Sequence, residues 1–179
     1  MPIPNFPAVF RQTLIAGVCL GQWLLPMPAA HAQEVSEYGM KAILFYRLSQ
    51  FVYWPADNKP PTPLILCVVG KNPFGSTLTQ IDQSIATIEI RQSPGDLVGC
   101  QLLFIPRSEA ANLEAWLSRI EPRRLVSVSD IPGFARAGGM IELPLDGERV
   151  GIVINRRSAQ KKGFEFSAQL LRLARVIEP

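Results

Sequence analysis

The chain of 179 residues contains a single histidine, His31. Histidine is the base of Ser-His-Asp and Cys-His catalytic systems and a common zinc ligand. His31 lies in a predicted signal peptide, so the exported chain would contain no histidine at all. This absence excludes those catalytic systems and the usual zinc sites, and we expect no enzyme activity, metal or cofactor.

An excess of charge of one sign is also missing. Removal of the 32-residue signal peptide from the 179 residues would leave 147 residues, with 17 basic and 15 acidic side chains and a net charge of +2. This value gives no argument for nucleic-acid binding or for a polybasic membrane patch. We therefore interpret the basic pairs Arg123-Arg124, Arg156-Arg157 and Lys161-Lys162 as solvated surface.

The first 32 residues have the parts of a secretory signal peptide. Arg11 supplies positive charge, residues 13–25 form an apolar run, and Ala30-His31-Ala32 has the small residues that a signal peptidase requires. The run is shorter than the roughly 20 apolar residues of a membrane span. We predict cleavage between Ala32 and Gln33, which leaves an exported, periplasmic domain at residues 33–179.

Cysteine is rare as well. Cys19 leaves with the signal peptide, and Cys67 and Cys100 remain. In an oxidising compartment two such cysteines more often pair than stay free. A bridge would stabilise the fold by roughly 3–4 kcal/mol on the chain-entropy estimate. The alternative is two buried thiols that act as small hydrophobic side chains.

Strand-like and helix-like patterns alternate along the exported chain. Continuous apolar runs are typical of buried parallel strands, and strict alternation is typical of a half-buried strand near an edge. The predicted strands are 64–69, 86–91, 100–105 and 125–128, followed by a hairpin of 140–145 and 149–155 around Asp146-Gly147. The predicted helices are 35–53, 73–83, one capped by Ser108, and 167–176. This order predicts an α/β fold, a single layered domain whose mostly parallel sheet is flanked by helices, with a C-terminal β-hairpin and closing helix.

Neither glycine-rich segment indicates a nucleotide site. Residues 70–75 are followed by Ser76-Thr77 where a phosphate loop needs Lys-Ser/Thr. Gly138-Gly139 opens a strand, whereas a dinucleotide fingerprint opens a helix. Turns or close backbone approach explain these glycines better, and Gly138 and Gly139 stay candidates for partner or ligand contact.

Two acidic residues are candidates for acid–base catalysis. Asp130 follows a predicted strand and Glu142 lies twelve positions later, a spacing that is common by chance. Asp130 could equally cap the turn that begins at Ile131. A hydrolase that uses both carboxylates is the least favoured hypothesis.

The remaining candidate binding residues lie on predicted surfaces. The helix ending at Tyr53 and Trp54 has more apolar surface than one buried stripe needs, so these aromatics are candidate interface anchors. Arg172 and Arg175 could pair with carboxylates of a partner or could be solvated. Asn155 is either the cap of the segment 156–162 or part of a ligand surface.

Several segments together resemble the YfiR family of exported proteins, in order from about Tyr38 to Val176. They are Lys41-Ala42 with Phe51-Val52-Tyr53-Trp54-Pro55, Leu66-Cys67-Val68-Val69-Gly70 with Asn72-Pro73-Phe74-Gly75, Ser127-Val128-Ser129-Asp130 with Phe134-Ala135 and Gly138-Gly139-Met140-Ile141, Val153-Ile154-Asn155, and Leu170-Leu171-Arg172-Leu173-Ala174. Their order and spacing carry the resemblance, since no single segment is diagnostic.

The resemblance implies a periplasmic regulator. The best-known type of the family holds an inner-membrane diguanylate cyclase inactive by binding its periplasmic part, so that loss of the regulator raises cyclic di-GMP and favours biofilm. Cys67 and Cys100 resemble the family's disulfide pair, and a second bridge found in some relatives has no counterpart here.

The leading hypothesis is therefore an inhibitor that docks on a membrane sensor protein, with a homodimer as a further possibility. The alternative is a small-molecule (solute) binding sensory module that uses the strand ends near Gly70 or Asp130.

Overall fold

The computed structural model describes residues 36–60, 62–84 and 88–179. All described residues belong to one compact unit, Glu34–Pro179. The predicted signal peptide and its cleavage site at Ala32 and Gln33 lie outside the described residues. Within the described part, no helix has the length and apolar character needed to cross a membrane.

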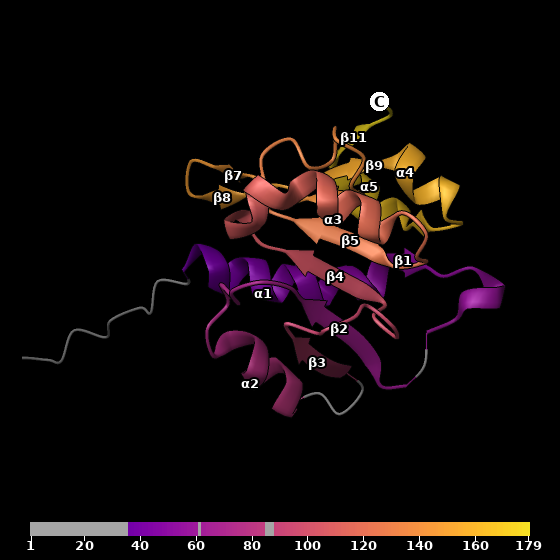
Figure 1. The fold of residues 1–179 in the computed structure, drawn as a ribbon. Coiled ribbons are helices and arrows are strands. Elements are labelled where there is room, and N and C mark those ends of the chain that lie inside the picture. Colours follow the sequence, from indigo (N-terminus) through magenta and orange to yellow (C-terminus); the bar gives the residue numbers. More distant parts are fainter. Residues whose placement is uncertain (1–35, 61, 85–87) are drawn as a thin grey trace, which may run out of the picture. The chain divides into compact units, whose positions relative to one another are not determined.

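A seven-stranded sheet forms the centre of this unit, in the order β11-β9-β6-β5-β4-β2-β3 (Figure 1). Its strands are β2 (Leu64–Val68), β3 (Ile88–Gln92), β4 (Leu102–Ile105), β5 (Val126–Ser129), β6 (Ile141–Glu142), β9 (Val153–Asn155) and β11 (Arg175–Ile177). The strands from β3 to β6 are parallel, β9 runs antiparallel to β6, and β11 runs parallel to β9. The predicted α/β class with a mostly parallel sheet is confirmed.

Helices and short strand pairs surround the sheet. The α-helices are α1 (Glu37–Leu48), α2 (Thr77–Ser84), α3 (Leu113–Ile120), α4 (Arg156–Lys161) and α5 (Ala168–Leu173), and the 3₁₀ helices are η1 (Ser49–Phe51), η2 (Ala56–Asn58) and η3 (Arg107–Asn112). β1 (Val52–Tyr53) pairs with β10 (Glu165–Phe166), and β7 (Leu145–Asp146) pairs with β8 (Arg149–Val150).

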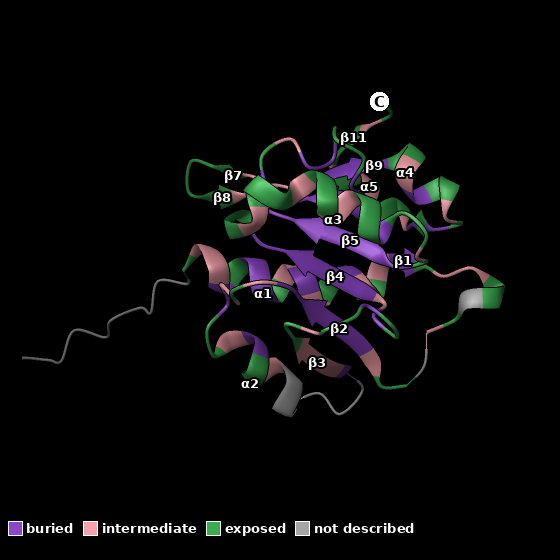
Figure 2. Ribbon diagram, in the orientation of Figure 1, coloured by how far each residue is buried: buried purple, intermediate pink, exposed green. Residues whose placement is uncertain are grey.

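The sheet separates two hydrophobic cores because successive side chains of a strand point to opposite faces. In β2, Leu66 and Val68 join the core with α1, α2 and α5, whereas Cys67 joins the core under α3. Figure 2 shows the central strands buried and the outer side of α3 exposed. Such two-sided burial explains why these strands are continuous apolar runs.

The first helix is shorter than predicted, because a 3₁₀ turn and a short strand replace its last five residues. Helix α1 ends at Leu48, and Val52 and Tyr53 form β1 instead. Val52 pairs with Phe166 of β10, a segment more than a hundred residues away. β-Branched and aromatic residues favour an extended backbone where a partner strand exists, and residue 54 precedes a proline, which disfavours the helical region.

Two predicted helix starts are also wrong. Helix α2 begins at Thr77, because after Pro73 the Asn72 side-chain oxygen accepts a hydrogen bond from the Phe74 amide (2.9 Å) and forms a local turn. Ser108 does not cap a helix but lies within η3, ahead of α3. The Arg107 amide at the start of η3 donates instead to Asp130 Oδ1, 2.7 Å away.

The C-terminal hairpin is confirmed as two ladders, β6–β9 and β7–β8. Gly147, with a φ of +59°, lies in its two-residue turn. The closing helix α5 is shorter than predicted, and Arg175 belongs to strand β11. The β-branched pair Val176-Ile177 adds this strand to the open edge of β9.

Candidate functional site at the carboxyl ends of the strands

The strand order changes direction at β2, which has β3 on one side and β4 on the other. Helix α2, which connects β2 to β3, packs in one core, and α3, which connects β4 to β5, packs in the other. The carboxyl ends of β2 and β4 therefore flank a topological switch point. In open α/β sheets, ligands bind in the crevice at such a point.

A cavity of about 200 Å³ lies at this switch point. Its lining comes from three segments: Tyr38 of α1, the loop 71–73 after β2, and Pro106 and Ser108 after β4. Lys71 is exposed, while Asn72 and Tyr38 are partly buried. The cavity thus combines one cation, one amide and one aromatic ring, which suits a small solute that has an anionic or aromatic part.

Behind the cavity wall, α1 is tied to the end of β5 by a buried ion pair. Ser36 caps α1 by accepting a hydrogen bond from the Gly39 amide (3.1 Å), and Tyr38 and Lys41 lie three residues apart on the same helix face. The Lys41 Nζ and Tyr38 hydroxyl groups donate to the same atom, Asp130 Oδ2, at 2.9 and 3.0 Å. Lys41 also forms an ion pair with Glu37.

This arrangement raises the pKa of Tyr38 to about 12. The largest cause is burial of the hydroxyl, followed by the negative charge of Asp130 and the hydrogen bond to it. The phenol therefore stays protonated, and its proton points at Asp130 while its ring lines the cavity. The Lys41 side chain is completely buried. Lys71, Asn72 and Ser108 are thus the polar side chains of the lining that can contact a solute.

The structure does not pair the two candidate catalytic carboxylates with each other. Asp130 is held by Tyr38, Lys41 and the Arg107 amide. Glu142 accepts hydrogen bonds from the Gly133 and Ala135 amides, at 3.2 and 3.1 Å. Each carboxylate is nearly buried and satisfies donors of its own, so both fix the loops that follow β4 and β5 and neither presents a free base to a solute.

Asn155 and the glycine pair support the same loop. Asn155 caps α4 by accepting from the Ser158 amide (3.0 Å), and its amide nitrogen donates to the Ala135 carbonyl (2.7 Å). Gly139 is buried against the ring of Phe134, which a β-carbon there would overlap. Gly138 is exposed, with a φ of +114° that favours glycine. Of these three, Gly138 is the residue open to a partner.

The aromatic and arginine candidates lie on separate elements. Tyr53 of β1 is 60% exposed, and the Trp54 ring packs edge-to-face on Phe164 at 5.4 Å between centroids. Arg172 of α5 and Arg175 of β11 are exposed. Among the described residues, no hydrogen bond or ion pair joins either arginine to Tyr53 or Trp54.

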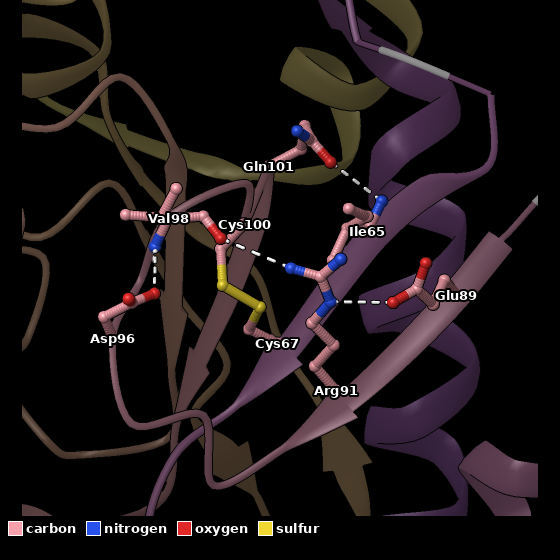
Figure 3. The surroundings of a disulfide bond; sticks show 8 residues. All are labelled: Ile65, Cys67, Glu89, Arg91, Asp96, Val98, Cys100 and Gln101. Carbon is pink, nitrogen blue, oxygen red and sulfur yellow. Dashed lines mark hydrogen bonds and ion pairs between the residues drawn. A yellow bond between two sulfur atoms is a disulfide. The ribbon is translucent and has the colours of Figure 1, made fainter.

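Cys67 of β2 and Cys100, which precedes β4, form a disulfide in the core under α3 (Figure 3). Their Cα atoms are 5.8 Å apart, within the usual range for a bridge. Beside it, Arg91 of β3 forms an ion pair with Glu89 (2.7 Å) and donates to the Val98 carbonyl (3.3 Å). The bridge fastens the loop before β4 to the centre of the sheet.

Comparison with known proteins decides the family. The family model described as YfiR/HmsC-like matches residues 38–175. The chain belongs to the YfiR/HmsC-like family. Its members are periplasmic regulators, so membership supports a periplasmic regulatory role over a catalytic one.

The structural comparison agrees on the fold of this YfiR/HmsC-like protein. A conserved domain protein of Vibrio cholerae superposes with a TM-score of 0.58 at 11% sequence identity, over 79% of this chain. The chain spans 60% of that solved chain, and this likeness concerns the fold alone. No curated protein matches the sequence.

Proposed function

We propose that this protein inhibits an inner-membrane signalling protein, a diguanylate cyclase, by binding the cyclase's periplasmic part. The observation that carries the proposal is the family match over residues 38–175. A binding role also agrees with the Asp130 and Glu142 carboxylates, which are engaged in holding the loops that follow β4 and β5.

Inhibition requires that the regulator bind the inactive conformation of the cyclase more tightly than the active one. We assign the contacts to side chains of the types that dominate protein interfaces: the exposed Tyr53 of β1 with its partly buried neighbour Trp54, and the exposed Arg172 and Arg175 near the C-terminus. Gly138 adds exposed backbone, whereas Gly139 and Asn155 act by shaping the loop beside it.

Deletion of the gene in its host tests the proposal. Cellular cyclic di-GMP, measured by mass spectrometry, is expected to rise and to return to its original level when the wild-type gene is restored. Restoration with Tyr53→Ala/Arg175→Ala, which removes two exposed side chains, should leave the level high while the protein stays folded. An unchanged level in a host that has such a cyclase contradicts the proposal.

The switch-point cavity favours a second function, a sensory module that binds a small solute. Lys71 and Asn72 would hold an anionic group of the solute, and the Tyr38 ring would cover its apolar part. A thermal-shift screen with small carboxylates and aromatic acids should give saturable stabilisation that Lys71→Ala abolishes. A flat screen favours protein docking alone.

A further inference from the structure

The sheet carries a second and larger cavity at its other end. This cavity, of about 560 Å³, lies where α3 and α4 end and β5 begins. Its volume falls within the range of about 300–1,000 Å³ typical of binding pockets. Two basic pairs line it, Arg123-Arg124 and Lys161-Lys162. The sequence alone indicates solvated surface for both pairs.

Four basic side chains face this cavity, and Glu121 is the acidic residue in its lining. The cavity lining therefore has a formal charge of +3. The exported chain as a whole has a net charge of +2, with 17 basic and 15 acidic residues. The positive charge of the protein is concentrated at this site, although the average composition gives no sign of it.

Stabilisation of the fold accounts for two of these four cations. Lys162 Nζ donates to the carbonyls of Ile120, Glu121 and Arg123 and so satisfies the end of α3. Burial is the main cause of the lowered pKa of Lys162. Arg124 forms an ion pair with Asp57, 2.5 Å away.

Arg123 and Lys161 are different. Within the described ranges, no hydrogen bond or ion pair engages the charged end of either side chain, and both line the cavity. Because Lys162 covers the α3 carbonyls, their partial negative charge does not oppose an incoming anion. The serines Ser118 and Ser158 in the lining add hydroxyl donors for carboxylate oxygens.

We infer that this basic cavity docks an acidic segment of the membrane partner, with Arg123 and Lys161 pairing with its carboxylates. The inference rests on the proposed function, since it supplies a contact site for that partner. Charge complementarity selects the occupant: surface cations of this kind set the rate and specificity of docking to a negative patch.

The binding test uses a fluorescent hexaglutamate peptide as the probe and hexaglutamine as its uncharged match, followed by fluorescence polarisation. At an ionic strength of about 0.01 M, where the Debye length is about 30 Å, hexaglutamate should bind saturably and hexaglutamine should not. Binding should disappear at about 1 M salt. Arg123→Glu/Lys161→Glu should weaken it by roughly tenfold or more, because attraction becomes repulsion.

Two further variants make this result specific. Arg47→Glu/Arg149→Glu changes the total charge equally at exposed positions on α1 and β8, and should leave binding within about twofold. Arg123→Gln/Lys161→Gln removes the two positive charges without adding negative ones. It replaces Arg123→Glu/Lys161→Glu in the binding test if that variant does not fold. Equal hexaglutamate binding by the pocket variants and wild type, or no binding by wild type, overturns the inference.

Crosslinking in the host separates this inference from the proposed function. A photo-reactive residue placed at Ser118, which is exposed in the cavity lining, should crosslink to an acidic periplasmic segment identified by mass spectrometry. The same residue at Glu148, in the hairpin turn, is the control. If other positions crosslink to the membrane partner and Ser118 does not, the docking site is refuted and the regulatory function stands. If the wild-type protein gives no crosslink to any membrane protein with any crosslinking reagent, both the docking site and the proposed function are refuted.

Discussion

The buried pair of Lys41 and Asp130 offers the sharpest test of how the fold is held. The substitution Lys41→Met keeps most of the length of the side chain and an apolar stem, but removes the charged end. Asp130 would then keep the Tyr38 hydroxyl and the Arg107 amide as hydrogen-bond donors and lose its countercharge. Both side chains of the pair are completely buried, so water cannot replace the ammonium group.

The expected cost is large for a single substitution. Removal of one partner from a buried ion pair typically destabilises a protein by about 3–5 kcal/mol, because the other charge is left uncompensated in a medium of low polarity. A domain of this size has a free energy of unfolding of about 5–15 kcal/mol in total. Lys41→Met should therefore remove a major part of the stability, and the end of β5 should separate from α1.

Urea unfolding followed by circular dichroism measures the effect. The midpoint should fall while the slope m stays the same, since m follows the surface exposed on unfolding. Lys59→Met, at an exposed position, is the matched control and should change the free energy of unfolding by less than about 0.5 kcal/mol. The double variant Lys41→Met/Asp130→Asn should be more stable than Lys41→Met, because the unpaired charge is gone.

Two results would refute this reasoning. A cost below about 1 kcal/mol for Lys41→Met would mean that the carboxylate finds water or another donor when the lysine is lost. Strict additivity of Lys41→Met and Asp130→Asn would mean that the two groups do not interact energetically, whereas contacting partners normally show a coupling of about 0.5–3 kcal/mol.

Three further predictions concern other parts of the fold. The bridge between Cys67 and Cys100 closes a loop with a sequence separation of 33, so Cys67→Ser/Cys100→Ser should lower the free energy of unfolding by about 4 kcal/mol on the chain-entropy estimate. Unfolding of the wild type with and without dithiothreitol checks this prediction. An unfolding midpoint that dithiothreitol does not change would contradict it. Gly139→Ala should cost about 1–3 kcal/mol because its β-carbon meets the Phe134 ring. Gly138→Ala has open space for its β-carbon and should cost about 1–3 kcal/mol from its backbone angle alone. A Gly139→Ala variant with the thermal midpoint of the wild type would contradict the overlap. Folding raises the pKa of Tyr38 to about 12, so the contribution of this hydroxyl to stability is present below about pH 10 and is lost as the pH rises toward 12. Between these pH values the free energy of unfolding should fall less steeply for Tyr38→Phe than for the wild type. An ultraviolet titration of the variant should lack the step near pH 12.

The central strands could be predicted because their sequence has one physical interpretation. A run such as Leu64 to Val69 is apolar on both faces, which suits a strand covered on both sides, and β2 is such a strand. Two of the predictions failed because a distant segment decides the local backbone. Val52-Tyr53 became a strand because β10 pairs with it, and Arg175 left the last helix because β9 has an open edge.

The binding features were less predictable than the fold, for the same reason. The basic pairs at 123–124 and 161–162 are separated by almost forty residues, and only the topology brings the ends of α3 and α4 to one cavity. The net charge of the chain hides this cluster, since it averages over surfaces that never meet.

Lys41 shows how much more the sequence contains than its local pattern. Helix α1 is apolar over most of its surface, and its charged side chains differ in burial: Arg47 is exposed, whereas Lys41 is completely buried. A buried lysine in turn requires an acidic partner, and parallel strands present such residues at their carboxyl ends. Asp130, 89 positions later, is that partner. The local pattern of α1 does not tell which of its charges is buried, because only the fold places Lys41 against the end of β5 and leaves Arg47 exposed.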